Sequence, residues 1–436
     1  MSIKTHTFPN GFKFVYEKNR SNSSNIQVFC DVGSIHEPED LRGSSHFIEH
    51  MCFKGTSNRT EARKLHMEYD KIGAYINAYT EKHHTCYIVK CDQDYTENMI
   101  NLLADMLMNS IFEKRNFRLE EKVVVEESVL SKDDPLFILY RGLNKSLYDG
   151  SAYDTPVDML EYHKTEFDYK KVIKYYKQFY RPDRMILSIV TDLSFDHIKH
   201  ILGKSFLATR RDDPQRAIVP NTCISPQNDS RYLLMKKPGI QTTHLVIGFR
   251  TNNEDRHKLW LLQNILSGPN SARMFTELRE ENGLTYTSGI ETTNYSAFGD
   301  FTFYAQSDSS KMIKNGTSRK KGVLPLIVDI IRDIYVDGLD QSEIDIAKGY
   351  VQGKINIKVD DGYIKCSHNG ASALIYPSEP LCPYSKIYDT FYKDITKADL
   401  DAVVRKYLRK DNMTVCMVGE HIPPLSVVKS VCDIII

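Results

Sequence analysis

Residues 43–56 read GSSHFIEHMCFKGT, and this stretch contains the pattern His46-x-x-Glu49-His50. On a helix, His46 and His50 are four residues apart, so their imidazoles lie on one face, one turn from each other. Two imidazoles in this arrangement suit two ligands of a tetrahedral zinc ion. Glu49 reaches the same side of the helix, where its carboxylate can take a proton from a water molecule that the metal activates. The stretch therefore predicts a helix that carries a catalytic zinc site.

A catalytic zinc site also needs a third protein ligand and an open fourth position. The candidate is an acidic helix predicted over residues 117–130, FRLEEKVVVEESVL. Within it, Glu120 and Glu127 are seven residues apart, which is about two helical turns, so they share one face. One carboxylate can bind the metal while the other accepts a hydrogen bond from the ring N–H of a ligand histidine. Periodicity alone leaves open which of the two is the ligand.

The composition is that of a globular protein with balanced charge. The chain has 436 residues, of which 41% are hydrophobic and 26% charged, so disorder and coiled coil are excluded and two or three domains are expected. Lysine plus arginine and aspartate plus glutamate both number 57, and a chain with zero net charge does not indicate a nucleic-acid partner. No apolar run approaches the roughly 18 residues that span a bilayer, so membrane insertion is not expected.

The cellular location is predicted from targeting signals and cysteine usage. The amino terminus shows neither the apolar segment of a signal peptide nor an Arg-rich amphipathic presequence. The nine cysteines have no framework spacing, which favours free thiols in a reducing compartment. We therefore expect a soluble, cytoplasmic protein. The 26 tyrosines against one tryptophan suggest an AT-rich coding genome, and if the source is a large DNA virus, a location in the virion would also fit.

The two halves of the chain repeat one another. Residues 171–192 (KVIKYYKQFYRPDRMILSIVTD) and 402–420 (AVVRKYLRKDNMTVCMVGE) each read as an amphipathic helix, a turn and an apolar strand, and aligning Met185 with Met413 gives an offset of 228 residues. At a similar offset, strands are expected at 26–34 and 243–251, and apolar helices at 98–112 and 324–336. We predict an α+β fold with two duplicated domains, each a mostly antiparallel β-sheet packed against helices.

A polar segment with three prolines, residues 208–231, lies near the midpoint of the chain and is expected to be a linker. It separates an N-terminal domain over residues 1–207, which carries the zinc motif, from a C-terminal domain over residues 232–436. The two predicted domains are therefore homologous, but only the first contains the metal-binding pattern.

Nearly the whole chain resembles the pitrilysin and mitochondrial processing peptidase family of inverted-motif zinc peptidases. Besides the zinc motif, the resemblance rests on short segments of the first half: residues 7–11 (TFPNG), 32–34 (VGS) with Glu37, 53–56 (FKGT), 73–80 (GAYINAYT) and 84–87 (HTCY). One departure is Ser45, where the family usually has alanine. The resemblance implies a half clamshell of the short, two-domain type with one Zn²⁺ ion per chain.

The resemblance also bears on the choice between the acidic residues. In the family, the third zinc ligand lies 76 or 77 residues after the second histidine, in a Glu-x-x-Val-Ile-x-x-Glu helix. Both Glu126 and Glu127 fit this spacing, and the register of the valines favours Glu127. Glu120 is then the supporting carboxylate.

Residues 271–286 (SARMFTELREENGLTY) resemble the family segment Arg-Leu-Phe-x-x-Leu-Arg-Glu-x-x-Gly-Leu-x-Tyr. This likeness implies that Arg279 holds a backbone carbonyl of the substrate and that Tyr286 stabilises the developing oxyanion. The strand around residues 77–87, with Asn77 and Ala78, would pair with the backbone of an extended substrate.

Together these observations predict a zinc metalloendopeptidase that hydrolyses peptides or unfolded protein segments, with Glu49 as the general base. The alternative is a noncatalytic core or partner subunit of the same fold, although such members have typically lost the zinc ligands that this chain retains. In two-subunit members, the zinc motif of one chain faces the arginine and tyrosine of the other. Because this chain has both motifs, a homodimer is expected, and a heterodimer with a related subunit is the alternative.

Overall fold

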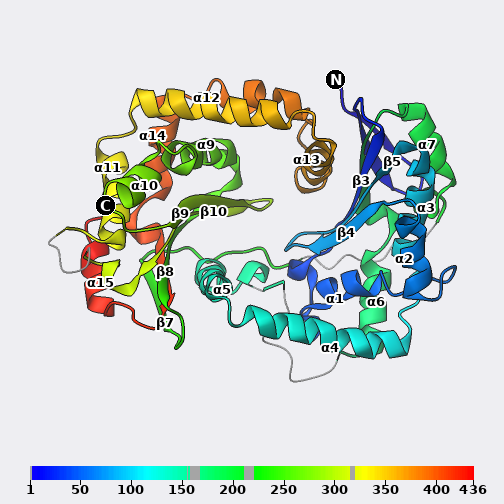
Figure 1. Ribbon diagram of the computed structural model, residues 1–436, viewed down its shortest axis with the longest axis horizontal. Coiled ribbons are helices and arrows are strands. Elements are labelled where there is room, and N and C mark those ends of the chain that lie inside the picture. Colours follow the sequence, from blue (N-terminus) through cyan, green and yellow to red (C-terminus); the bar gives the residue numbers. More distant parts are fainter. Residues whose placement is uncertain (1, 155, 158–166, 211–219, 315–319) are drawn as a thin grey trace. The chain divides into compact units, whose positions relative to one another are not determined.

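The computed structural model describes residues 2–154, 156–157, 167–210, 220–314 and 320–436. The chain divides into two compact units, each built on one β-sheet (Figure 1). The first unit comprises Met1–Leu130, Thr155–Thr222 and Ile357–Lys386, and the second comprises Ser131–Asp154, Cys223–Asn356 and Ile387–Ile436. Each unit combines a sheet with helices, so the predicted α+β class is confirmed.

The first unit contains a six-stranded sheet in the order β1-β2-β6-β3-β5-β4. Its strands are β1 (Lys4–Thr7), β2 (Lys13–Lys18), β3 (Ser23–Cys30), β4 (Tyr75–Thr80), β5 (Thr85–Asp92) and β6 (Met185–Thr191). β2 and β6 are parallel, and the other neighbouring pairs are antiparallel. β6 is central and buried along its whole length, which explains its apolar sequence MILSIVT. β4 lies at the edge of the sheet.

Helices cover one face of this sheet and share its main apolar core. They are α1 (Ser44–Met51), α2 (Ala62–Asp70), α3 (Thr96–Met108), α4 (Lys114–Ser131), α6 (Tyr169–Phe179), α7 (Phe195–Lys204) and α8 (Phe206–Thr209). In the core, Phe47 and Met51 of α1 belong to the same cluster as Val28 of β3 and Tyr87 of β5. This packing fixes α1 on the sheet through its apolar residues, so its histidines lie on the opposite, polar side.

The second unit contains a five-stranded sheet in the order β7-β11-β8-β10-β9. Its strands are β7 (Arg231–Lys236), β8 (Thr242–Asn252), β9 (Thr287–Asn294), β10 (Phe298–Asp308) and β11 (Met413–Gly419). β7 and β11 are parallel, and the other pairs are antiparallel. The helices of this half are α9 (Arg256–Ser267), α11 (Val323–Val336), α12 (Gln341–Lys358), α14 (Lys397–Tyr407) and α15 (Leu425–Cys432).

Each sheet is also covered by one helix from the other half of the sequence. α13 (Gly362–Ile375) packs on β3 and β6 of the first sheet, on the face opposite α3 and α7 (Figure 1). Its Gly370 permits this close approach, since a Cβ atom there would lie 2.1 Å from the Phe29 ring. α5 (Pro135–Tyr148) packs on β8 and β11 of the second sheet, where a Cβ on Gly142 would lie 2.6 Å from Leu233.

The order of the elements confirms the predicted duplication. α4 and α12 begin 227 residues apart, as do α5 and α13, while β6 and β11 begin 228 residues apart. The two sheets lie on either side of the predicted linker 208–231, of which residues 211–219 fall outside the described part of the chain. The compact units depart from the predicted division into 1–207 and 232–436 at α5 and α13, because each of these helices packs on the sheet of the other half.

Within the described residues, the structure contains no helix that combines the length and the apolar character needed to cross a membrane.

Candidate metal centre

Helix α1 is eight residues long and begins directly after Gly43, whose φ of 83° lies in the left-handed region that favours glycine. The buried carboxylate of Glu37 accepts hydrogen bonds from the backbone N–H groups of Gly43 (2.6 Å) and Ser45 (2.8 Å). These donors at the start of a helix have no partner within the helix itself, so Glu37 satisfies them. Glu37 thus fixes where the helix begins and, with it, the positions of His46, Glu49 and His50.

The three predicted ligands converge. The Nε2 atoms of His46 and His50 lie 3.2 Å apart, and Oε2 of Glu127 on α4 lies 3.7 Å from Nε2 of His50. Zinc binds histidine nitrogen and carboxylate oxygen at about 2.0–2.2 Å, so neighbouring ligand atoms of a tetrahedral site lie roughly 3.4 Å apart. Among the described residues, these three side chains form the group whose ligand atoms could hold a metal ion, all within 4.8 Å of one another. The donor set fits zinc.

Glu120 orients His50 from the opposite side of the ring. Nδ1 of His50 donates to Oε1 of Glu120 at 2.9 Å, which leaves Nε2 with a free lone pair towards His46. The other oxygen, Oε2, accepts from Nζ of Lys54 at 2.6 Å. Burial alone would raise the pKa of Glu120, but the hydrogen bonds from His50 and Lys54 lower it below its ordinary value, so the carboxylate stays ionised. Glu120 therefore has the geometry of a supporting carboxylate.

The two histidines differ in electrostatics. Burial, together with the charge of His50, lowers the pKa of His46 to about 4 and favours the neutral ring that a metal requires. Burial also acts to lower the pKa of His50, but the hydrogen bond to Glu120 and the surrounding carboxylates raise it above its ordinary value. Nδ1 of His46 is buried and has no hydrogen-bond partner among the described residues.

Glu49 lies on α1 between the two histidines and is only 8% exposed. Thr80, the last residue of β4, donates a hydrogen bond from Oγ1 to Oε2 of Glu49 at 2.6 Å. Burial raises the pKa of Glu49 above its ordinary value, against the opposing effect of the Thr80 hydroxyl. A carboxylate with a raised pKa is a stronger base, which is the property that proton abstraction near neutral pH requires.

The predicted substrate-binding residues Asn77 and Ala78 lie on β4, in the same unit as α1. The backbone N–H of Ala78 donates to Oδ1 of Asn77 at 2.8 Å, and Nδ2 of Asn77 donates to the hydroxyl of Tyr75 at 2.9 Å. β4 is an edge strand, and such a strand offers unpaired backbone groups to an added chain.

Arg279 and Tyr286 lie in the second unit. α10 (Arg273–Phe275) continues into one π-helical turn, Thr276–Glu280, which carries Arg279. The guanidinium carbon of Arg279 lies 4.8 Å from the centre of the Tyr286 ring and 5.0 Å from that of Phe275. Tyr286 is 84% exposed. The structure thus brings the predicted arginine and tyrosine together on the surface of one unit, while the metal ligands lie in the other.

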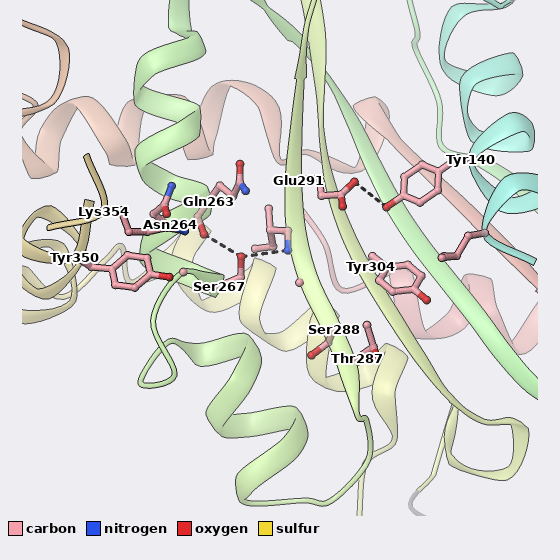
Figure 2. A pocket seen from close by; sticks show the side chains of 14 residues that line it. Tyr140, Gln263, Asn264, Ser267, Thr287, Ser288, Glu291, Tyr304, Tyr350 and Lys354 are labelled. Atoms are coloured by element: carbon pink, nitrogen blue, oxygen red, sulfur yellow. Dashed lines mark hydrogen bonds between the residues drawn. The ribbon is translucent and has the colours of Figure 1, made fainter. Parts of the chain in front are cut away.

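The second unit also contains a cavity of about 390 Å³ that the sequence did not indicate (Figure 2). Within it, the hydroxyl of Tyr140 donates to Oε2 of Glu291 at 3.1 Å, and Oγ of Ser267 accepts from the backbone N–H of Ile290 at 3.1 Å. Arg279 and Tyr286 are not among its lining residues. The lining comes from α5, α9, β9, β10 and α12, so no spacing along the chain could reveal it.

Two residues that contact the site were also missed: Thr80 beside Glu49, and Lys54 beside Glu120. Both lie in segments that carried the family resemblance, FKGT and GAYINAYT. Their partners are distant in sequence, so only the packing of β4 and α4 against α1 identifies their contacts.

Comparisons with known proteins agree with this geometry. Residues 13–156 match the family described as insulinase (peptidase family M16), and residues 166–350 match the peptidase M16 inactive domain. An uncharacterized zinc protease of Bacillus subtilis is 29% identical over 377 residues, covering 86% of this chain and 88% of its own length. The mitochondrial-processing peptidase subunit beta of Caenorhabditis elegans is 25% identical over 426 residues, covering 95% and 89%.

The fold matches that of solved proteases. The crystal structure of a protease from Helicobacter pylori superposes with a TM-score of 0.86 at 20% identity, covering 96% of this chain and 99% of the other. The first half of the periplasmic protease PqqL from Escherichia coli superposes with a TM-score of 0.78 at 14% identity, covering 99% and 96%. At these identities the likeness establishes the fold.

Proposed function

The chain belongs to the insulinase family of peptidases, peptidase family M16, and we propose that it is a zinc metalloendopeptidase that cleaves peptides or unfolded segments of proteins. The observation that carries the proposal is the convergence of His46, His50 and Glu127 beside the buried carboxylate of Glu49. Relatives named zinc proteases support zinc as the metal.

His46, His50 and Glu127 would hold the zinc ion, one per chain. When bound, zinc acts as a Lewis acid that polarises the scissile carbonyl and makes a water molecule acidic near neutral pH. Glu49 takes the proton of the attacking water and later delivers it to the leaving amine. Glu120 accepts the Nδ1–H of His50 and so keeps Nε2 of that ring available for the metal.

The substrate is an extended chain in this proposal. The edge of β4, with Asn77 and Ala78, pairs with the substrate backbone, which selects unfolded segments over folded ones. Arg279 holds a backbone carbonyl of the substrate, and the hydroxyl of Tyr286 stabilises the oxyanion that develops during attack. The exposure of Tyr286 is compatible with such a role, because its hydroxyl is accessible from outside its own unit.

We further propose that the active form is a homodimer. Arg279 and Tyr286 of one protomer would serve the metal centre of its partner, and a twofold axis would generate two equivalent sites. The presence of both motifs in one chain supports this arrangement. A heterodimer with a related subunit is the alternative assembly.

The proposal is tested by incubating the purified chain with a library of denatured peptides, with and without a chelator, and analysing the products by mass spectrometry. Cleavage within peptides that stops on chelation and returns with added zinc is the expected result. Metal content is measured on the same preparation. A chain that binds no zinc and cleaves no peptide would instead be a noncatalytic core or partner subunit of this fold.

A further inference from the structure

The carboxylate of Glu49 receives a hydrogen bond from outside the zinc motif. Oγ1 of Thr80 donates to Oε2 of Glu49 at 2.6 Å, and the carboxylate is almost completely buried. A buried carboxylate that lacks donors is costly, and a donor to an ionised group makes one of the stronger hydrogen bonds in proteins. The contact therefore determines how the carboxylate of Glu49 is turned.

Thr80 is itself held rigidly. It pairs with Thr85 at the end of the β4–β5 hairpin, and the turn is closed by a hydrogen bond from the backbone N–H of Glu81 to the carbonyl of His84 at 2.8 Å. Thr80 is β-branched, which restricts rotation about its Cα–Cβ bond. Its hydroxyl is thus a donor at a fixed place, and it does not depend on the conformation of a long side chain.

We propose that Thr80 is a positioning residue for the general base Glu49, an inference that rests on the proposed peptidase function. By occupying Oε2, the Thr80 hydroxyl leaves Oε1 as the oxygen that accepts the proton of the attacking water. Side chains two residues apart on a strand lie on the same face, so Thr80 and Ala78 both lie on the face of β4 that α1 covers. One strand then pairs with the substrate and aligns the base that acts on it.

The inference is tested with Thr80→Val, which keeps the shape of the side chain and removes the hydroxyl, and with Thr80→Ser, which keeps the hydroxyl. The matched control is Thr191→Val. Thr191 is likewise buried at the last position of a strand in the same sheet, and its hydroxyl contacts Ser24 at 2.7 Å. Values of kcat and KM are measured on fluorescein-labelled, denatured casein, and zinc content is measured for each variant.

The expected result for Thr80→Val is a kcat about 10- to 100-fold below that of the wild type, a fraction of the factor that a general base contributes. KM and zinc content should stay within twofold, Thr80→Ser should recover most of kcat, and Thr191→Val should resemble the wild type. A wild-type kcat in Thr80→Val, failure of Thr80→Ser to recover, or loss of zinc from Thr80→Val would overturn the inference alone. An inactive wild type would overturn the proposed function and this inference with it.

Discussion

The Nε2 atoms of His46 and His50 face each other at 3.2 Å, one turn apart on a helix of eight residues. Two neutral imidazole nitrogens at that distance bring two lone pairs together unless a proton or a cation lies between them. Because Nδ1 of His50 is already engaged with Glu120, the shared region is where a cation would bind.

We therefore expect the purified chain to carry about one zinc ion, and His46→Ala or Glu127→Ala to empty the site largely, since each removes one of three protein ligands. Metal analysis after dialysis measures this. The control is His197→Ala, which changes an exposed histidine on α7. Full zinc content in Glu127→Ala, together with loss of zinc in Glu120→Ala, would reverse the roles assigned to these two residues.

The second prediction separates the base from the ligands. Glu49→Gln should retain zinc and reduce peptide cleavage by about 10²- to 10⁴-fold, because the amide keeps the shape of the side chain but cannot take a proton. Zinc content and kcat are measured on the same preparation. Normal cleavage by this variant would rule out Glu49 as the general base.

The support of His50 can be tested through zinc affinity. Glu120→Gln should weaken zinc binding about 10- to 100-fold, as loss of a carboxylate behind a ligand histidine does. Lys54→Met should have a smaller effect in the same direction, because Lys54 acts through Oε2 of Glu120. Competition with a chromophoric chelator measures both.

The control for Lys54 is Lys171→Met. Lys171 forms an exposed ion pair with Asp40 at 2.5 Å in the same unit, so its loss should leave zinc affinity unchanged. If Lys171→Met weakened zinc binding as much as Lys54→Met, the contact with Glu120 would not be the cause.

The fourth prediction concerns acid stability. His84 is buried, its ring nitrogens have no hydrogen-bond partner among the described residues, and burial, with a smaller effect of the charge of His83, lowers its pKa to about 4. The folded state therefore disfavours the protonated ring. As pH falls from about 6.5 towards 4, the unfolded chain takes up the proton first, and the folded state loses stability.

A pKa of about 4 against an ordinary value of 6.5 corresponds to a loss of about 2 kcal/mol in the free energy of unfolding between pH 7 and pH 5. His84→Phe should remove that part of the pH dependence, whereas His197→Phe should not. Urea denaturation in the presence of a chelator measures the effect without the contribution of the metal. Equal pH dependence in His84→Phe and the wild type would refute the assignment.

The last prediction tests the homodimer. Glu49→Gln and Tyr286→Phe chains should each be poorly active, because every site in either dimer lacks one group. Mixed dimers should recover one complete site, formed by the zinc motif of the Tyr286→Phe chain and the tyrosine of the Glu49→Gln chain. Activity is measured after subunit exchange, which fluorescence energy transfer between labelled chains verifies.

A mixture of two Glu49→Gln preparations with different labels is the matched control and should stay inactive. Absence of recovery despite verified exchange would show that the chain acts alone or that its partner is a different protein.

The sequence predicted those parts of the site that depend on local periodicity. His46, Glu49 and His50 could be identified because a helix places residues three and four apart on one face. The choice of Glu127 over Glu120 as the ligand needed the family resemblance, since both share a face of α4. The contacts of Thr80 and Lys54 could not be predicted, because strand and helix packing bring their partners near.

The fold was predictable to a similar degree. Repeated patterns around Met185 and Met413 indicated two α+β halves with matching strands, which the structure contains. The destinations of α5 and α13 were not predictable, because an amphipathic pattern shows that a helix has an apolar face but not which sheet that face covers. Their glycines, which allow the close packing, carry no apolar signal at all.

This exchange of helices means that the repeat in the sequence and the unit that folds are different objects. A fragment ending at residue 207 would keep all strands of the first sheet but lack α13, leaving Phe29, Ile88 and Ile186 without their cover. The complementary fragment would lack α5 over β8 and β11. Each half of the gene thus encodes one repeat but no self-sufficient domain, and the two halves are obligate partners in folding whether or not a peptide bond joins them.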